Sequence, residues 1–330
     1  NSPYTDQKDI SEYQILSSSN ENYQTIDRMR FAFGNAAAGA CNISQSTDAP
    51  TTLGFTKSHK TDVTTVNTTA SGQQIINLFY RIEGQDLRNS GWNHLSPSSF
   101  LTLSFYFKTT KTGTSKLPIM FRTRHGTNYY YVKNVTVTDP TNWNRYTVTI
   151  PGNSNLQIDD ATTTGMDFFF TYYSGPDKDT SSEGSWGSTN AYSTSESTNY
   201  FDSTSNDMFI TGIQLEVGDT ATTFEHRSFA EEKKRCERYY QTYGFTTLMG
   251  NLAGQTGTPR ILFPTEMRDT PSVTVEYGSN GNGSFRNQND GSTLTGNTTF
   301  NYYTNGFDCR GNSGSVNTIY SSTYKADAEL

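Results

Sequence analysis

Apolar and polar residues alternate along several stretches of the chain, and this period of two is typical of half-buried β-strands. From residue 101 to 108, Leu101, Leu103, Phe105 and Phe107 fall on one face. The pattern recurs at Tyr146, Val148 and Ile150, at Phe168, Phe170 and Tyr172, and at Phe209, Thr211, Ile213, Leu215 and Val217. We expect each set to face a core.

Turn-forming residues separate these segments, as at Thr112-Gly113-Thr114 and Asp139-Pro140. Short turns join antiparallel strands, whereas parallel strands need a longer crossover. The fold class predicted is therefore all-β, with two antiparallel sheets packed as a sandwich. The polar stretch between Ser174 and Asp207 is too long for an ordinary hairpin connection, so it is either functional or mobile.

One helix is predicted, from Phe229 to Tyr243. Ser228 is its candidate N-cap, Glu231 and Glu232 occupy its first turn, and Gly244 ends it. An apolar seam is expected from residues that recur along one face, namely Phe229, Cys236, Tyr240 and Tyr243. This seam packs either on the protein's own sandwich or against symmetry copies, and both interpretations remain open.

Beyond Gly244 the composition changes to a Gly-rich link followed by short apolar runs. Val273 and Val275 alternate with polar residues, which predicts a small β unit of fewer than 90 residues. The expected domains are residues 1–227 as a sandwich, 228–243 as a connecting helix and 244–330 as a small C-terminal β domain. A core of that size is marginal, so association between copies would stabilise it.

Composition excludes several classes of protein. The mean hydropathy of -0.69 would suit a disordered chain, but 20 Phe, 21 Tyr and 3 Trp supply ample apolar surface. A net charge of -7 disfavours nucleic acid as a partner, and no apolar run is long enough for membrane insertion. Three widely spaced cysteines, Cys41, Cys236 and Cys309, indicate neither a disulfide framework nor a CxxC metal site.

Catalytic motifs are absent from the sequence. There is no HExxH, Gly-x-Ser-x-Gly, Walker loop or GxGxxG opening a helix, and the four histidines have no ligand-like spacing. We therefore expect no enzyme activity, no catalytic residues and no cofactor.

Acidic residues in the predicted loops leave two alternatives open. The pairs are Asp159 with Asp160, Asp177 with Asp179, and Asp202 with Asp207. Oxygen-rich loops can hold a structural calcium, and two carboxylates about 5 to 10 Å apart can hydrolyse a glycosidic bond. The simpler interpretation is that they are ordinary turn formers.

Aromatic residues are the more plausible ligand contacts. Sugar rings pack their C–H faces on exposed Tyr and Trp, and polar side chains bind the hydroxyls. The candidates are Tyr129, Tyr130 and Tyr131 beside Arg124, Trp186 and Tyr192 in the long loop, and Tyr302 with Tyr303 in the last unit. The alternative is that these residues belong to the core or to the sheet surface.

Residues 209–218, 222–228 and 231–240 resemble a module found in bacteriophage tail fibres and other virion proteins, particularly those of marine phages. Asp27-Arg28 resembles an early Asp-Arg pair of that module, although Met29 stands where Trp is usual. Residues 81–87, 101–105, 263–271 and 326–330 and Trp186 also match, so the resemblance covers about residues 27–330.

The resemblance implies a carbohydrate-binding-type jelly roll in a virion adhesin or structural fibre, usually homotrimeric, at the virion surface outside the cell. It carries over no catalytic residues. It implies host cell-surface polysaccharide and other virion proteins as partners. Arg81, Glu83 and Asp86 are expected to form a buried polar network that holds the sheets together, with a ligand site as the alternative.

Three functions follow in order of preference. The first is a non-enzymatic fibre subunit that recognises a host glycan through a multivalent homotrimer, with its C-terminal domain as the probable tip. The second is a structural capsid, baseplate or fibre decoration protein in which the jelly roll is a spacer. The third is a polysaccharide depolymerase. A surface map of Tyr and Trp distinguishes the first from the second, because a spacer needs no exposed aromatic cluster.

Overall fold

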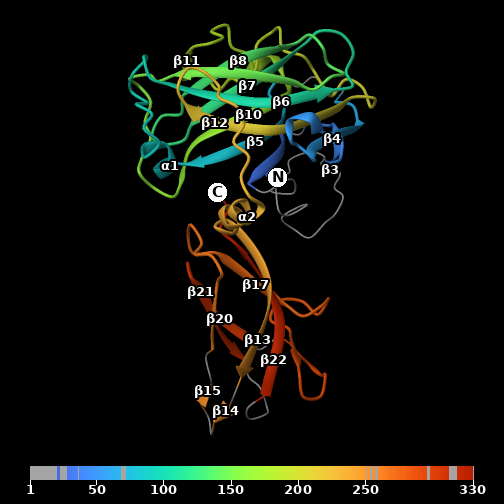
Figure 1. Ribbon diagram of the computed structural model, residues 1–330, viewed down its shortest axis with the longest axis vertical. Helices are drawn as coiled ribbons and strands as arrows, with labels where there is room; N and C mark the ends of the chain where they lie inside the picture. The colour runs from blue at the N-terminus through green and yellow to red at the C-terminus, as the bar shows by residue number, and fades with distance from the viewer. Residues whose placement is uncertain are drawn as a thin grey trace. The chain divides into compact units, whose positions relative to one another are not determined.

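The computed structural model describes residues 21–22, 28–35, 37–67, 72–249, 251–252, 255–256, 259–295, 298–311 and 318–329. Two compact units divide the chain, residues 1–227 and 228–329. Figure 1 shows the first in blue to yellow and the second in gold to red. No helix within the described ranges has the length and apolar content needed to cross a membrane.

The first unit is an antiparallel jelly-roll β-sandwich, as predicted. Its seven-stranded sheet has the order β1 (Glu21–Asn22), β2 (Met29–Gly34), β5 (Ile75–Glu83), β10 (Thr164–Ser174), β7 (Ser115–Thr123), β8 (Tyr130–Val137) and β11 (Trp186–Gly187). Its five-stranded sheet has the order β3 (Ala40–Ser46), β4 (Ser58–Thr65), β12 (Asp207–Val217), β6 (Phe100–Thr109) and β9 (Asn144–Pro151). Short helices at η1 (Thr51–Leu53), α1 (Gly84–Arg88) and η2 (Pro176–Lys178) lie in its connections.

The core between the two sheets is built by the predicted alternation. The predicted apolar faces of β6, β9 and β10 all contribute to one cluster, in which Leu103, Phe105 and Phe170 are completely buried. Aromatic rings fill much of this space, and Phe105 meets Phe170 across the sheets with ring centroids 4.9 Å apart. Aromatic residues thus supply the core that the low aliphatic content would not.

Strand β12 departs from the predicted alternation. Met208 and Ile210 face the core, so Phe209 lies on the outer face, whereas Ile213 and Leu215 farther along do pack against the core. The register with β6 shifts between Thr211 and Gln214, and Gly212 there has φ +59°. A bulge at a glycine in the left-handed region inserts an extra residue and reverses which side chains face inward.

The second unit is a small β domain with a core of its own. One sheet pairs β13 (Tyr240–Met249), β22 (Thr318–Asp327), β18 (Phe285–Asn287) and β19 (Thr293–Leu294), with β17 (Ser272–Glu276) also on β22. Another has the order β16 (Arg260–Leu262), β21 (Gly306–Gly311) and β20 (Thr298–Tyr303), and β14 (Asn251–Leu252) pairs with β15 (Gln255–Thr256). Val273 and Val275 are buried as predicted.

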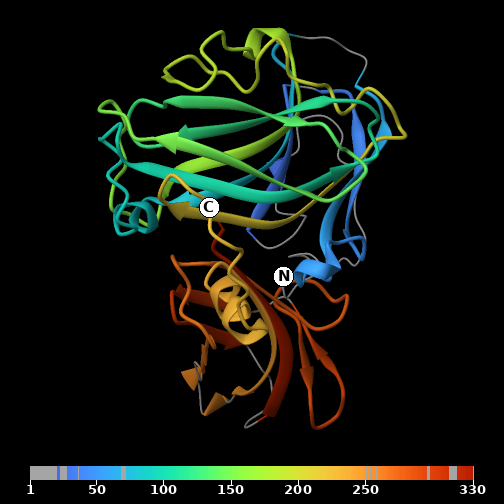
Figure 2. The same ribbon diagram turned by 45° about the horizontal axis from the view of Figure 1, so that its top comes forward.

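The helix of this unit is shorter than the sequence pattern predicts. Helix α2 spans Phe229–Glu237, and Ser228 caps it by accepting a hydrogen bond from the Glu231 amide. The prediction that it continues to Tyr243 is wrong, because β13 pairs with β22 from Tyr240 onward. Tyr, Thr and Phe dominate this stretch and favour strand, and the long antiparallel ladder outweighs the helical spacing. Figure 2 shows the helix in gold before the orange and red strands.

A histidine is buried inside the sandwich without a hydrogen-bond partner. His59 on β4 lies opposite Ile210 and is only 2% exposed, and neither ring nitrogen is hydrogen-bonded. Burial lowers the pKa of His59 to about 4, because a charged imidazolium there would lose its hydration. The pKa of His94 is also lowered, by burial and by the positive charge of Arg88.

We predict that acid destabilises the sandwich through His59. His59 takes up a proton near pH 6.5 in the unfolded chain but only near pH 4 in the folded chain. Stability that is present at neutral pH is therefore lost as the pH falls from 6.5 to about 4. The unfolding free energy should fall by about 2 kcal/mol between pH 7 and pH 5 from this residue. Urea unfolding at both pH values measures the fall. His59→Gln should remove most of it and His226→Gln, at an exposed histidine, should not. An unchanged fall in His59→Gln contradicts the prediction.

Candidate functional site

Two of the predicted sugar-contacting tyrosines come together on the outer face of the seven-stranded sheet. Tyr130 projects from β8, and Tyr192 reaches it from the long connection between β10 and β12. They are 9% and 5% exposed, inside a small apolar cluster with Phe79 and Phe169. The Tyr192 ring meets Phe169 edge-on at 5.5 Å. The connection therefore covers this part of the sheet, and neither ring is an open platform.

The neighbouring aromatic candidates pack on the other side of the sheet. Tyr131 is 5% exposed and belongs to the main core, and Tyr129 is partly buried against it. Trp186 lies 5.4 Å from the Tyr131 ring, and its indole Nε1 donates to the Pro151 carbonyl at 2.7 Å. Successive residues of a strand point to opposite faces, so residues 129–131 cannot share one surface.

A charged network crosses the same outer face. Asp167 on β10 is completely buried and lies opposite Arg81 on one neighbouring strand and Arg122 on the other. The Arg122 Nε donates to Asp167 at 2.9 Å, and the Nε atoms of Arg81 and Arg124 lie 3.6 Å from it. Burial alone would lower the pKa of Arg122, but the neighbouring Asp167 carboxylate raises it.

This network differs from the one expected of Arg81, Glu83 and Asp86. Arg81 contacts Asp167 on the neighbouring strand of the same sheet. Glu83 is buried and accepts from Gln85 at 2.7 Å, and Asp86 lies in the first turn of α1. Arg81 occupies an outward-facing position of β5, on the same face as Phe79, so its side chain cannot reach across the core.

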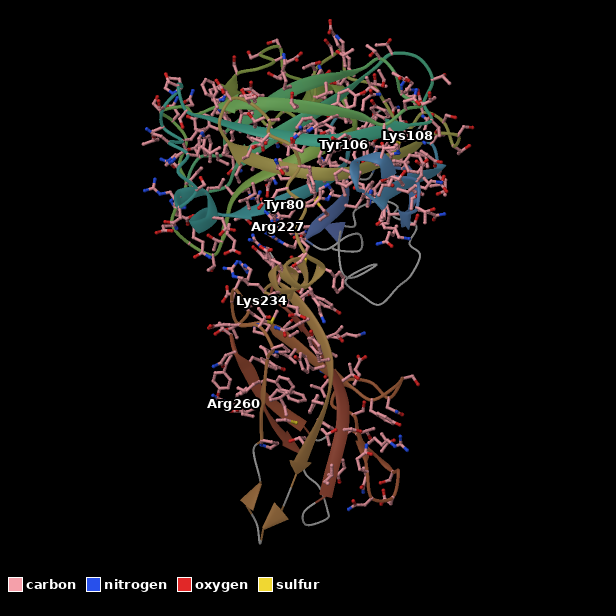
Figure 3. All side chains as sticks on the ribbon, in the orientation of Figure 1. Tyr80, Tyr106, Lys108, Arg227, Lys234 and Arg260 are labelled. Atoms are coloured by element: carbon pink, nitrogen blue, oxygen red, sulfur yellow. The ribbon has the colours of Figure 1, made fainter. Side chains whose placement is uncertain are left out.

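The second unit carries a tyrosine that is both exposed and fixed in place. Tyr303 on β20 is 36% exposed, and the Arg260 guanidinium lies 4.2 Å from its ring centroid. Asp308 accepts from the Arg260 Nε at 2.8 Å and from the Tyr303 hydroxyl at 3.0 Å. The hydrogen bond from Arg260 lowers the pKa of Asp308. Leu262, 66% exposed, is an outward neighbour on the same small sheet, and Figure 3 labels Arg260 there.

Tyr302 lies on the opposite side of that sheet. It is 38% exposed and stacks on Phe300 at 6.2 Å. Tyr302 and Tyr303 therefore cannot form one platform, because adjacent strand residues point apart. Among the tyrosines and tryptophans of the described ranges, these two are the only exposed ones.

The residues expected at an oligomer interface are mostly used within the unit. Cys236 and Tyr240 are 4% and 5% exposed. Tyr243 lies in β13, where its hydroxyl donates to Glu237. Phe229, at the start of α2, is 63% exposed and is the one of the four that leaves a large apolar surface open.

Several segments that carry the family resemblance meet at one place in the second unit. Glu237 is nearly buried and accepts from Tyr243 and from the Thr265 hydroxyl, the latter at 3.0 Å. The Arg268 amide donates to the Arg238 carbonyl, and Arg268 Nη1 donates to the Ala328 carbonyl, both at 2.9 Å. The segments near 231–240, 263–271 and 326–328 are thus joined to one another by hydrogen bonds.

The remaining resembling segment forms a corner after β12. Glu216 accepts from the amide and hydroxyl of Thr222, and Phe224 packs on Phe55 with centroids 4.9 Å apart. His226 contacts the Leu53 carbonyl at 3.1 Å. These contacts fix the last residues of the first unit on the outer face of the five-stranded sheet, which is again an architectural role.

The acidic residues considered for calcium or hydrolysis are bound locally. Their partners are His125 for Asp159, Asn89 for Asp160, Gln73 for Asp177, Ser193 for Asp179, Lys111 for Asp202 and Lys60 for Asp207. Within the described part of the chain, no three His, Cys, Asp or Glu side chains gather as metal ligands would. Each of these acids therefore has a polar partner within the first unit.

No protein-family model and no curated protein matches the sequence. The enzymatically active domain of tailspike protein 4 from bacteriophage CBA120 superposes with a TM-score of 0.30 at 12% identity, over 58% of this chain and 19% of that one. The CBM22-1 xylan-binding domain from Paenibacillus barcinonensis gives 0.31 at 10%, over 64% and 99%. A family 11 carbohydrate-binding module from Clostridium thermocellum gives 0.31 at 9%, over 62% and 97%.

This chain spans about a fifth of the tailspike structure. At TM-scores near 0.3 these likenesses carry no inference about function.

We predict that Asp167→Ala destabilises the sandwich strongly. Removing the carboxylate leaves the Arg122 guanidinium, 13% exposed, without its main partner, and breaking one half of a buried ion pair costs about 3–5 kcal/mol. Urea unfolding measures the loss. Asp160→Ala, at an exposed carboxylate on the same unit, should change the unfolding free energy by about 0.5 kcal/mol or less. A loss below about 1 kcal/mol for Asp167→Ala is incompatible with a structural role for the network.

Proposed function

We propose that this protein is a non-enzymatic adhesin subunit of a bacteriophage fibre at the virion surface, and that it recognises a host cell-surface glycan as a homotrimer. The observation that carries the glycan part is Tyr303, an exposed ring fixed by Arg260 and Asp308. The phage context rests on the resemblance of residues 209–240 to tail-fibre modules.

The Tyr303 surface has the parts that a sugar requires. The ring and Leu262 offer apolar contact to C–H faces, and Arg260, Asp308 and Asn301 offer donors and acceptors to hydroxyls. The Arg260 guanidinium and the hydrogen bond to Asp308 hold the Tyr303 ring in place before a ligand binds. Little conformational entropy is therefore lost on binding. A single such contact is weak, so three copies on one fibre are needed to hold a virion.

The exposed tyrosines of the described ranges lie in the second unit. The described sandwich has no tyrosine or tryptophan exposed to the extent of Tyr303, since Tyr130 and Tyr192 are covered. The recognition surface centred on an exposed tyrosine therefore belongs to the second unit. The purely structural alternative for the whole chain lacks an explanation for Tyr303, and no specific observation favours a depolymerase.

We predict that Tyr303→Ala weakens binding to host cells or to a glycan array about tenfold, because the stacking ring is lost. Tyr302→Ala is the matched control, since it removes an equally exposed tyrosine from the other side of the same sheet. It should bind like the wild type. Equal losses in the two variants, or none in Tyr303→Ala, would place recognition elsewhere.

We predict a trimeric mass by light scattering at micromolar concentration. Phe229→Ser should shift the mass toward monomer, because it removes an apolar side chain that is 63% exposed within its own chain. Far-ultraviolet circular dichroism of the variant should stay unchanged. A clean wild-type monomer contradicts the trimer, and multivalency would then have to come from other virion proteins.

A further inference from the structure

One tryptophan of the sandwich is not used in its cores. Trp92 is 4% exposed in the main core, and Trp186 packs against that core. Trp143 belongs to none of the three apolar clusters and is half-buried in the connection between β8 and β9. A large ring outside the core, on a connection at the end of a sandwich, is a natural contact for a ligand.

The Trp143 ring is held from two sides. Its Nε1 donates to the Asp48 Oδ1 at 2.9 Å, and its ring centroid lies 6.4 Å from that of Phe209 with the two ring planes steeply inclined. Asp48 also accepts from the Lys108 Nζ at 2.6 Å, and Figure 3 labels Lys108 near one end of the sandwich. Burial alone would raise the pKa of Asp48, but Lys108 and Trp143 lower it, so Asp48 is a carboxylate at neutral pH.

The connection that carries Trp143 is stiffened by its own polar groups. The Thr109 amide donates to the Pro140 carbonyl at 2.8 Å, which ties the connection to β6. The Asn142 amide group donates to Asp139 at 3.0 Å, and that of Asn144 donates to the Asp139 carbonyl at 2.9 Å. Asn142, which directly precedes Trp143 in the chain, is exposed, and its side-chain carbonyl is a hydrogen-bond acceptor.

Charges around Trp143 are balanced. The two lysines that lie over the Phe209 ring each pair with an aspartate, Lys108 with Asp48 at 2.6 Å and Lys60 with Asp207 at 2.9 Å. Asp62 adds one more carboxylate, 3.9 Å from Lys60. A surface with paired charges and no excess of cations suits a neutral, hydroxyl-rich ligand better than an acidic one.

We propose that the surface formed by Trp143, Asp48, Lys108 and Asn142 binds a ring of a neutral saccharide. The sugar's C–H face packs on the indole, Asp48 and Asn142 accept from its hydroxyls, and Lys108 donates to them. This site lies in the first unit and is independent of Tyr303, which is in the second. Each chain would then offer two weak contacts to a polysaccharide.

Tryptophan fluorescence of the full chain tests the site. Neutral hexasaccharides of β-1,4-glucan, xylan and mannan serve as probes, and a hexauronate is the acidic comparison. At least one neutral probe should shift the emission, the hexauronate should not, and Trp143→Phe should abolish the shift. Asn142→Ala, an exposed substitution, should weaken the interaction several-fold, and thermal unfolding of both variants checks that the sandwich is intact.

The Tyr303→Ala variant distinguishes this site from the proposed adhesin surface. A neutral probe should still shift the tryptophan emission of this variant, because Trp143 is unchanged. Binding of a neutral probe that calorimetry detects without any emission shift overturns the Trp143 site and leaves the Tyr303 surface standing. A shift that survives in Trp143→Phe, or that only the hexauronate produces, also overturns it. Absence of any binding by the neutral probes refutes the proposed site.

Discussion

Burial of the seven-stranded sheet on both faces is the constraint on which the first unit depends. Strand β10 places Phe168 and Phe170 in the main core and Asp167 and Phe169 on the outer face, and all four are nearly or fully buried. A strand buried on two sides cannot rely on alternation of apolar and polar residues alone. The charge on Asp167 therefore has to be matched by cross-strand neighbours, and Arg122 supplies a direct hydrogen bond.

The long connection after β10 follows from the same constraint. Its residues Ala191 and Tyr192 complete the apolar cluster on the outer face, and the Tyr192 hydroxyl accepts from Arg122 at 3.1 Å. What the sequence presents as a polar loop available for binding is thus a cover over the sheet. The connection that carries Trp143 is likewise held by polar contacts, from Asp48 and from the Pro140 carbonyl.

The second unit differs from the first in that its core is built from few residues. Its apolar cluster centres on Phe307 and Tyr324, and Glu237 joins the helix to Tyr243 and Thr265 around it. A small domain buries a smaller fraction of its surface, so more of its large side chains remain outside. Leu262 and Tyr303 are such side chains, and the ion pair of Arg260 with Asp308 keeps Tyr303 in one position.

The sequence by itself determined the class of fold, the faces of β6, β9 and β10, the Ser228 cap and the change of composition near the helix. These depend on neighbours along the chain, through strand alternation and capping chemistry. Only the tertiary structure decided where the inward-facing positions of β12 shift by one residue, where α2 ends and which face of the sheet Arg81 lies on. It alone brought Arg260 to Asp308 and Asp48 to Trp143, because these partners are distant in sequence and meet only through strand order and connection packing.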